Sequence, residues 1–429
     1  MEGDIVMKSF NYDIDFVRNQ FPACKLEVNG APIAYLDGPG GTQLPQRVID
    51  RVVEYMIEQN ANEGGNFKAS VFCDIVEDGA REACADLLGC KPEEVGFNCS
   101  STQNNSNFAH AFARQMGPKD EILTNELEHR ANIAPWLHLE KDGHIVKVAK
   151  LNTETQQLDL DDFKSKLNEN TKLVSLNWAS NGLGTVTDVK KLIKMAHEVG
   201  AITVVDAVHY AAHFPIDVKE IDTDVLICSA YKWFGPHMGV IYMKEELIEK
   251  LDFYNVMCED IATGPRKFHM GTPQYELEAG VIEAVNFIAS VGEKYTDYFE
   301  DELKGLSGRR RNVVAGMLAF DLYESGLAKQ LRVGLREIPG VNVNGPAEGE
   351  PRTPTVVFTV DGFTTDEVTK VLGERGINAW HGDYYAVEIM NAMGLLDKGG
   401  MVRLGLAPYC TQSDIDRALN AIRTMVREG

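Results

Sequence analysis

Short apolar runs that alternate with helical patterns constrain the fold of this 429-residue chain more than any other feature. Most of the runs are rich in Val and Ile and too short for helices, which is typical of buried strands: Glu94–Asn98, Glu121–Thr124, His144–Val148, Lys172–Trp178, Ala201–Asp206, Asp224–Cys228 and Gly239–Met243. Between two of them, Asp188–Val199 has apolar residues at three- and four-residue steps and stops before Gly200, as a helix does. The pattern predicts an α/β fold whose mainly parallel sheet is covered on both faces.

The pattern changes after about residue 280, where a second and smaller α+β domain is expected. Helical stretches and strand candidates follow one another there: Glu276–Ser290, Gly308–Tyr323, Thr355–Val360, Thr364–Arg375, Met401–Leu406 and Thr411–Val426. The length suits two or three domains. We expect an N-terminal segment over residues 1–30 that packs on the small domain, a large domain over 31–285 and the small domain over 286–429.

Composition and charge restrict the partners. The hydrophobic fraction of 44% and the charged fraction of 25% are ordinary for a globular protein. A net charge of −22 argues against binding to nucleic acid or to an anionic membrane, because both favour a basic surface. Eight cysteines without CxxC pairs or zinc-site spacing indicate a reducing compartment and no metal. With no secretory signal pattern and no apolar run of about 20 residues, we expect a cytoplasmic protein.

Polar residues gather where the predicted strands end. Ligands of open parallel sheets bind beyond the carboxyl ends of the strands. One crevice there would hold a lysine, a carboxylate, an imidazole, an amide and several hydroxyls, from Lys232, Asp206, Glu128, His129, Asn181, Ser100, Ser101, Thr102, Ser229 and Tyr231. This set suits pyridoxal phosphate, which needs a lysine to hold its aldehyde as an imine and a carboxylate to keep its pyridine nitrogen protonated. Its phosphate needs hydroxyls and N–H groups, best supplied at a helix N-terminus.

The chain resembles a known family in several motifs taken together. They occur in this order: YLDGPGGT (35–42), NELEHRANIAPW (125–136), SNGLGTV (180–186), VVDAVHY (204–210), CSAYKWFGPHMG (228–239), MGTPQYE (270–276) and VRLGLAPYCT (402–411). They are similar to those of class V aminotransferases of pyridoxal phosphate fold type I, in the cysteine-desulfurase-like branch. The resemblance implies a seven-stranded, mainly parallel sheet in the large domain, a small amino-acid substrate and a homodimer with shared active sites.

The resemblance also implies roles for single residues. Lys232 would be the lysine that forms the imine, Asp206 would pair with the pyridinium nitrogen, and His129 would stack on the cofactor ring. The remaining positions would bind cofactor or substrate. Asn181 and His209 match contacts around the ring hydroxyl; phosphate contacts fall on Ser101, Thr102, Ser229, Tyr231 and, from the neighbouring subunit, Thr272; Arg403 matches the arginine that clamps the substrate carboxylate.

The chain departs from the family at one loop that matters for chemistry. Cysteine desulfurases carry a nucleophilic cysteine there, whereas Tyr385 stands at about that position, and a phenol cannot accept sulfur as a persulfide. The nearest cysteine in sequence is Cys410. The loop also holds His381, Asp383 and Tyr384; it is either a packed surface loop or a lid over the substrate in which His381 and Tyr385 contribute. In addition, His209 replaces a glutamine and Tyr231 a phosphate-site histidine.

These observations predict a pyridoxal-phosphate-dependent enzyme acting on a small amino acid. We expect a lyase that cleaves a C–S or C–Se bond, or eliminates a β-substituent, without a protein persulfide. An aminotransferase and an amino-acid epimerase are alternatives within the fold. A non-catalytic partner in sulfur transfer is an alternative of another class.

Overall fold

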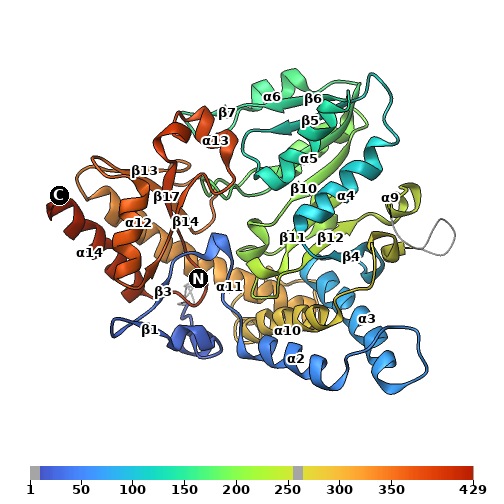
Figure 1. Cartoon of the computed structure of the whole chain (residues 1–429), viewed down its shortest axis with the longest axis horizontal. Coiled ribbons are helices and arrows are strands. Elements are labelled where there is room, and N and C mark those ends of the chain that lie inside the picture. The colour runs from blue at the N-terminus through green and yellow to red at the C-terminus, as the bar shows by residue number, and fades with distance from the viewer. Residues whose placement is uncertain (1–9, 255–263, 429) are drawn as a thin grey trace, which may run out of the picture.

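The seven predicted strands form one sheet, and each bound lies within one residue of its predicted position. The computed structural model of the chain describes residues 10–254 and 264–428. The sheet has the order β4-β12-β11-β10-β9-β5-β6, and β12 alone among these strands runs opposite to the other six (Figure 1). The strands are β4 (Val95–Asn98), β5 (Glu121–Asn125), β6 (Ile145–Ala149), β9 (Thr171–Asn177), β10 (Ile202–Asp206), β11 (Val225–Ser229) and β12 (Gly239–Met243).

Helices cover both faces of this sheet, which confirms the predicted α/β architecture. Successive side chains of a strand point to opposite faces, and they join two different apolar cores: Ile122 and Leu173 pack in one, Leu123 and Val174 in the other. The first core includes side chains of α4 (Ser101–Ala113) and α5 (Arg130–Lys141). The second includes α3 (Lys68–Leu88), α7 (Val189–Glu198), α10 (Tyr275–Gly292) and α11 (Gly308–Arg336).

A second, four-stranded antiparallel sheet lies at the side of the first, in the orange and red part of Figure 1. Its order is β13-β14-β17-β16, from β13 (Val341–Asn344), β14 (Thr355–Val360), β17 (Met401–Gly405) and β16 (Trp380–Gly382). Its helices are α12 (Thr365–Glu374), α13 (Val387–Ala392) and α14 (Gln412–Glu428). The remaining helices and strands are α1 (Ile14–Arg18), β1 (Glu27–Val28), β2 (Ala31–Pro32), β3 (Ala34–Tyr35), α2 (Gln46–Glu58), β7 (Leu151–Asn152), β8 (Gln157–Leu158), α6 (Leu160–Lys166), α8 (Val218–Ile221), α9 (Glu245–Lys250) and β15 (Ile377–Asn378).

Helix α11 is longer than the sequence predicts. The predicted helix stops at Tyr323, before a Ser-Gly pair of the kind that marks turns. In the structure the helix continues to Arg336, and Leu327, Leu331 and Leu335 are buried on it. Burial of this apolar face therefore overrides the weak helix propensity of Ser and Gly.

Residues 10–30 contact the C-terminal part of the chain. The Tyr12 ring stacks on Tyr323 with centroids 4.0 Å apart, and its hydroxyl donates to the carbonyl of Pro408. Arg18 donates to the carbonyl of Tyr409 at 2.7 Å. The domain bounds and the assignment of the N-terminal segment to the small domain stay predictions. Among the described residues, the structure contains no helix long and apolar enough to cross a membrane.

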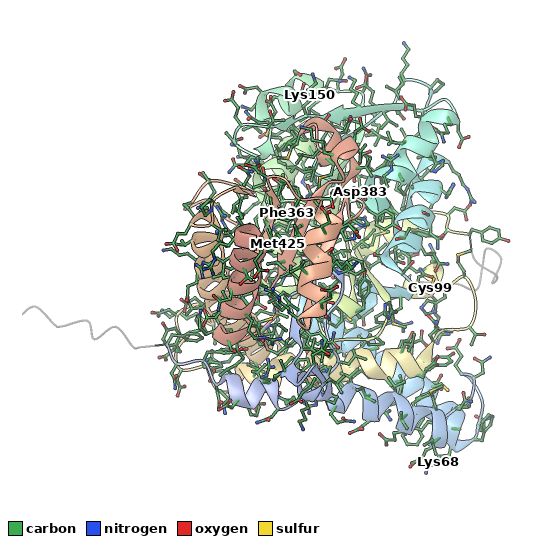
Figure 2. The ribbon with its side chains drawn as sticks, turned by 60° about the vertical axis from the view of Figure 1, so that its left-hand side comes forward. Lys68, Cys99, Lys150, Phe363, Asp383 and Met425 are labelled. Atoms are coloured by element: carbon green, nitrogen blue, oxygen red, sulfur yellow. The ribbon has the colours of Figure 1, made fainter. Side chains whose placement is uncertain are left out.

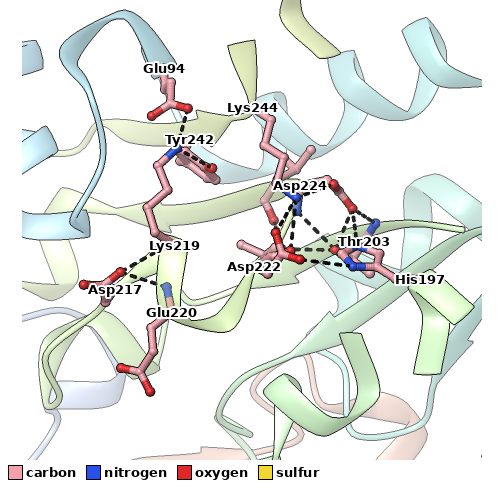
Figure 3. Close-up of polar contacts among 12 residues, drawn as sticks. Glu94, His197, Thr203, Asp217, Lys219, Glu220, Asp222, Asp224, Tyr242 and Lys244 are labelled. Carbon is pink, nitrogen blue, oxygen red and sulfur yellow. Dashed lines mark hydrogen bonds and ion pairs between the residues drawn. The ribbon is translucent and has the colours of Figure 1, made fainter. Parts of the chain in front are cut away.

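A polar network ties strands together at the end of the sheet opposite the carboxyl termini of the parallel strands (Figure 3). Asp224 accepts hydrogen bonds from His197 Nε2 at 2.9 Å, from Thr203 N at 2.8 Å and from Lys244 Nζ at 2.9 Å. Burial alone raises the pKa of Asp224, but these partners hold it below its usual value. The three partners come from α7, β10 and the residue after β12. The network therefore fixes strands whose opposite ends carry the predicted site residues.

The crossing of α10 and α11 depends on glycine, which gives a testable prediction. A Cβ atom at Gly292 would overlap the backbone of Asn312 and Gly316, whereas a Cβ at Gly326 would meet no atom within 4 Å. We expect Gly292→Ala to lower the free energy of unfolding by about 1–3 kcal/mol through overpacking. Gly326→Ala should raise it by about 0.5–1 kcal/mol, as an exposed helix position does. Urea unfolding followed by circular dichroism measures both, and equal effects of the two variants would contradict this packing.

Candidate active site

The predicted polar residues do gather at one edge of the central sheet. Asp206 is the last residue of β10, and Lys232 ends a short 3₁₀ turn that follows β11. His129 is the N-cap of α5 after β5, and Asn181 follows β9. Parallel strands bring these segments to the same end of the sheet, as the sequence predicts.

Lys232 is a buried amine without a carboxylate partner among the described residues. Only 8% of it is exposed, and its Nζ donates to the carbonyl of Pro39. Burial and the nearby Arg403 lower the pKa of Lys232 to about 7, while Asp206 opposes the shift. At neutral pH a large share of this amine is therefore uncharged and nucleophilic. The ring of Tyr231 lies 5.2 Å from Nζ and stacks on His237.

Asp206 is buried at the end of its strand. One carboxylate oxygen accepts a hydrogen bond from the backbone N–H of Val208 at 2.8 Å. Burial raises the pKa of Asp206 to about 6, against the opposing effects of this hydrogen bond and of Lys232. A protonated ring nitrogen beside the carboxylate would favour its charged form.

His129 presents a neutral ring. Its Nδ1 accepts a hydrogen bond from the N–H of Ala131 at 3.0 Å and so caps α5, which leaves the proton on Nε2. Burial, followed by the charges of Lys232 and Arg403, lowers the pKa of His129 to about 4. The ring centroid of Tyr385 lies 5.6 Å from that of His129. Tyr385 itself is 66% exposed, so it stands on the solvent side of the imidazole.

Hydroxyl groups line the start of α4. Ser229 donates to the hydroxyl of Ser101 at 2.8 Å, and Ser100 caps the helix by accepting from the N–H of Gln103. Thr102 lies exposed in the first turn. The N-terminus of a thirteen-residue helix with hydroxyls beside it suits a phosphate group. Thr272 is exposed on another segment and, with Cys99 and Gln103, lines a neighbouring cavity of 320 Å³.

Arg403 is a buried cation whose nearest partners are not carboxylates. It is 3% exposed, its Nη1 donates to the carbonyl of Asn181 at 2.9 Å, and its guanidinium lies 4.2 Å from the ring centroid of Tyr384. Its Nε has no partner among the described residues, and burial lowers the pKa of Arg403 to about 10. Asp37 acts on this charge electrostatically, but no carboxylate forms an ion pair with Arg403 among the described residues, so the arrangement favours an incoming anion.

His209 is buried near this group. Burial, followed by the charges of His213, Lys232, Arg403 and His129, lowers the pKa of His209 well below its usual value, and its Nε2 contacts the hydroxyls of Thr353 and Thr355, at 3.1 and 2.9 Å. His381 does not join the group. His381 pairs in register with Val402, the neighbour of Arg403, so its side chain lies on the other face of the small sheet. There its Nε2 is 3.6 Å from Asp366. The cofactor role of His209 and the substrate role of His381 stay predictions.

The sequence singled out Tyr385 but not Tyr384 as a site residue, although Tyr384 is the one that covers Arg403. Both residues have a positive φ, +39° and +61°, in the turn after β16. Two adjacent tyrosines in a loop carry no periodicity, so the sequence cannot indicate which ring turns inward. A buried carboxyl, Glu128, was also not assigned a role; amide groups of Asn125 and Asn132 donate to it, and burial raises its pKa well above the usual range.

The sheet is mainly parallel, a buried lysine follows β11, and a buried carboxylate ends β10, the strand beside it. This arrangement is that of a pyridoxal-phosphate-dependent enzyme of fold type I. The chain belongs to the class V aminotransferase family, whose model matches residues 34–307 and 313–418.

Similar proteins include cysteine desulfurases. An uncharacterized protein of Mycobacterium tuberculosis is 30% identical over 96% of this chain and 99% of its own length. A probable cysteine desulfurase of Synechocystis is also 30% identical, over 96% of this chain and 95% of its own. The solved apo structure of cysteine desulfurase from Thermococcus onnurineus superposes with a TM-score of 0.83 at 25% identity, covering 99% of this chain and all of that one.

The residues present fit pyridoxal phosphate, the cofactor of this family. A lysine amine with a pKa of about 7, a buried aspartate and a hydroxyl-lined helix N-terminus meet the needs of its aldehyde, its ring nitrogen and its phosphate. When bound, the cofactor withdraws electrons from the α-carbon of the amino acid.

The pKa of Lys232 gives a prediction for cofactor uptake. Only the uncharged amine attacks an aldehyde, so we expect the apoprotein to bind pyridoxal phosphate about tenfold faster at about pH 8 than at about pH 6. Stopped-flow absorbance measures this rate, and borohydride reduction with mass spectrometry locates the modified residue.

Variants at two lysines serve as controls for that measurement. Lys232→Ala should abolish the borohydride-trapped product, while Lys370→Ala, at an exposed position, should leave it unchanged. A flat pH profile or label retained by Lys232→Ala would contradict the assignment.

Proposed function

We propose that this enzyme is a lyase that removes a sulfur or selenium substituent from the β-carbon of a small amino acid without forming a protein persulfide. One observation carries the proposal: Tyr385 stands beside His129 at about the position where the similar cysteine desulfurases are expected to have their nucleophilic cysteine. The cofactor-binding residues remain, but this position offers no thiol.

Each residue of the site has a task in this reaction. Arg403 binds the substrate carboxylate through its N–H groups, and His129 provides a flat neutral surface for the cofactor ring. Asp206 would keep the ring nitrogen of the cofactor protonated. Lys232 would hold the cofactor through its amine and would take the proton from the α-carbon of the substrate. The β-substituent would leave with the electron pair of the C–S bond, so that cysteine and water would give pyruvate, ammonia and sulfide.

The cysteines of the chain support a reaction without a persulfide. Cys410 is fully buried, its thiol contacts the carbonyl of Tyr35, and burial raises its pKa well above the usual range. Cys99 is exposed, and Figure 2 draws it well apart from Asp383, which precedes the two tyrosines. Cys258 lies outside the described residues. The seven described cysteines are all free, which suits the cytoplasm as the proposed location.

We also propose a homodimer in which Thr272 reaches the phosphate of the neighbouring subunit. Large apolar side chains are exposed on α2 and around the start of α3: Val53, Met56, Ile57, Phe67, Val71 and Ile75. Clusters of this kind mark interaction surfaces, and a second copy of the chain is the occupant that also explains an exposed Thr272.

The products formed from cysteine test the proposed reaction. With pyridoxal phosphate and a reducing agent present, we expect pyruvate, ammonia and sulfide in equal amounts and no alanine. Tyr385→Cys restores a thiol at the loop and should divert part of the carbon to alanine. Chromatography of the carbon products measures both outcomes.

Other products would identify other reactions. Alanine from the unaltered enzyme would contradict the absence of a persulfide step. Pyridoxamine phosphate would indicate an aminotransferase, and solvent deuterium at the α-carbon without net loss of substrate would indicate an epimerase. A protein that neither takes up the cofactor nor turns over any amino acid would be a non-catalytic partner.

The dimer is tested at its most exposed apolar residue. Ile57 is 76% exposed, and Ile57→Asp should shift the protein from dimer to monomer and weaken cofactor retention, because a buried interface does not tolerate an unpaired charge. Leu322→Asp, on α11, should leave the dimer intact. Analytical ultracentrifugation measures the mass, and a dimeric Ile57→Asp variant would contradict this interface.

A further inference from the structure

The turn that carries the two tyrosines is held in place by the other part of the chain. Asn181 Nδ2 donates to the carbonyl of Tyr384 at 2.8 Å, and the N–H of Arg130 donates to the carbonyl of Tyr385 at 2.8 Å. Asp383, labelled in Figure 2, accepts from the N–H of Tyr385. A positive φ is costly for tyrosine and persists where the surroundings impose it, often at functional sites.

Three residues of this region form a closed set of contacts. Arg403 donates to the backbone carbonyl of Asn181, Asn181 donates to the backbone carbonyl of Tyr384, and the Tyr384 ring lies over the guanidinium of Arg403. The ring is therefore fixed by its own backbone and by the cation beneath it.

Each of these residues keeps one buried polar atom without a partner among the described residues. They are the hydroxyl of Tyr384, Nε of Arg403 and Oδ1 of Asn181. Burial raises the pKa of Tyr384, so its hydroxyl is a neutral donor. A buried polar atom without a hydrogen bond is unfavourable, and three of them in one set of contacts indicate a ligand with several polar groups.

The hydroxyl and the guanidinium lie close together, because the ring centroid of Tyr384 is 4.2 Å from the guanidinium carbon of Arg403. A carboxylate binds a guanidinium in its plane, along the N–H edge. An amino acid whose carboxylate binds Arg403 would therefore bring its other polar groups near the Tyr384 hydroxyl.

We propose that Tyr384 determines substrate specificity: its hydroxyl hydrogen-bonds a heteroatom on the β-carbon of the substrate while Arg403 holds the carboxylate. This inference rests on the proposed function, in which that heteroatom is the leaving group. The hydrogen bond from the Tyr384 hydroxyl favours amino acids with a polar β-substituent over those with an alkyl side chain.

The test uses acids without an amino group, so that binding does not require reaction at Lys232. The probes are propionate, 3-hydroxypropionate and 3-mercaptopropionate, titrated calorimetrically into the holoenzyme. We expect both substituted acids to bind about three- to tenfold more tightly than propionate, as one added hydrogen bond gives. Tyr384→Phe keeps the ring on Arg403 and should remove this preference while leaving the propionate affinity unchanged.

A second tyrosine provides the matched control. Tyr254→Phe removes a hydroxyl from a residue that is 71% exposed and should keep the preference of the unaltered enzyme. Equal affinity of the unaltered enzyme for all three acids, or a preference that survives in Tyr384→Phe, would overturn the assignment. Failure of the proposed reaction would appear separately, in the products from cysteine, because these probes report binding alone.

Discussion

Two basic side chains, Lys232 and Arg403, are buried at one end of the central sheet, and the rest of the site is organised around them. Burial of a charge is unfavourable unless another charge compensates it. Both side chains are held by backbone carbonyls, of Pro39 and Asn181, and neither forms an ion pair with a described carboxylate. The amine of Lys232, much of it uncharged at neutral pH, thus stays available for the aldehyde of the cofactor, and the guanidinium of Arg403 stays available for an anion.

The sequence predicts the part of the fold that depends on burial and the part of the site that depends on topology. The bounds of the seven strands were predicted to within one residue, because short apolar runs end where a strand leaves the buried interior. Lys232, Asp206 and His129 were brought together because they follow strands that share one sheet edge. Helix α2 was not predicted, although its sequence has the two-faced pattern of a surface helix, as that of α7 does.

Side-chain direction in loops could not be predicted. His381 is one residue from Trp380, which pairs with Arg403, and this single step puts it on the opposite face of the sheet. The choice between Tyr384 and Tyr385 depends on two positive φ angles, which only the assembled structure reveals. The chain shares its fold with a cysteine desulfurase over nearly its whole length, and under the proposed function the chemistry differs because of this one turn.

The hydrogen bond from Arg403 to Asn181 joins the two sheets of the molecule. Arg403 belongs to β17 of the small sheet, and Asn181 follows β9 of the large one. If the proposed carboxylate binds Arg403, its binding and the contact between the two sheets are coupled through this hydrogen bond. By thermodynamic linkage, the coupling free energy is the same in both directions, so a change that disfavours the contact would weaken binding to the extent of that coupling. Under the proposed function, substitutions at this contact, far from the reacting atoms, would thus adjust affinity.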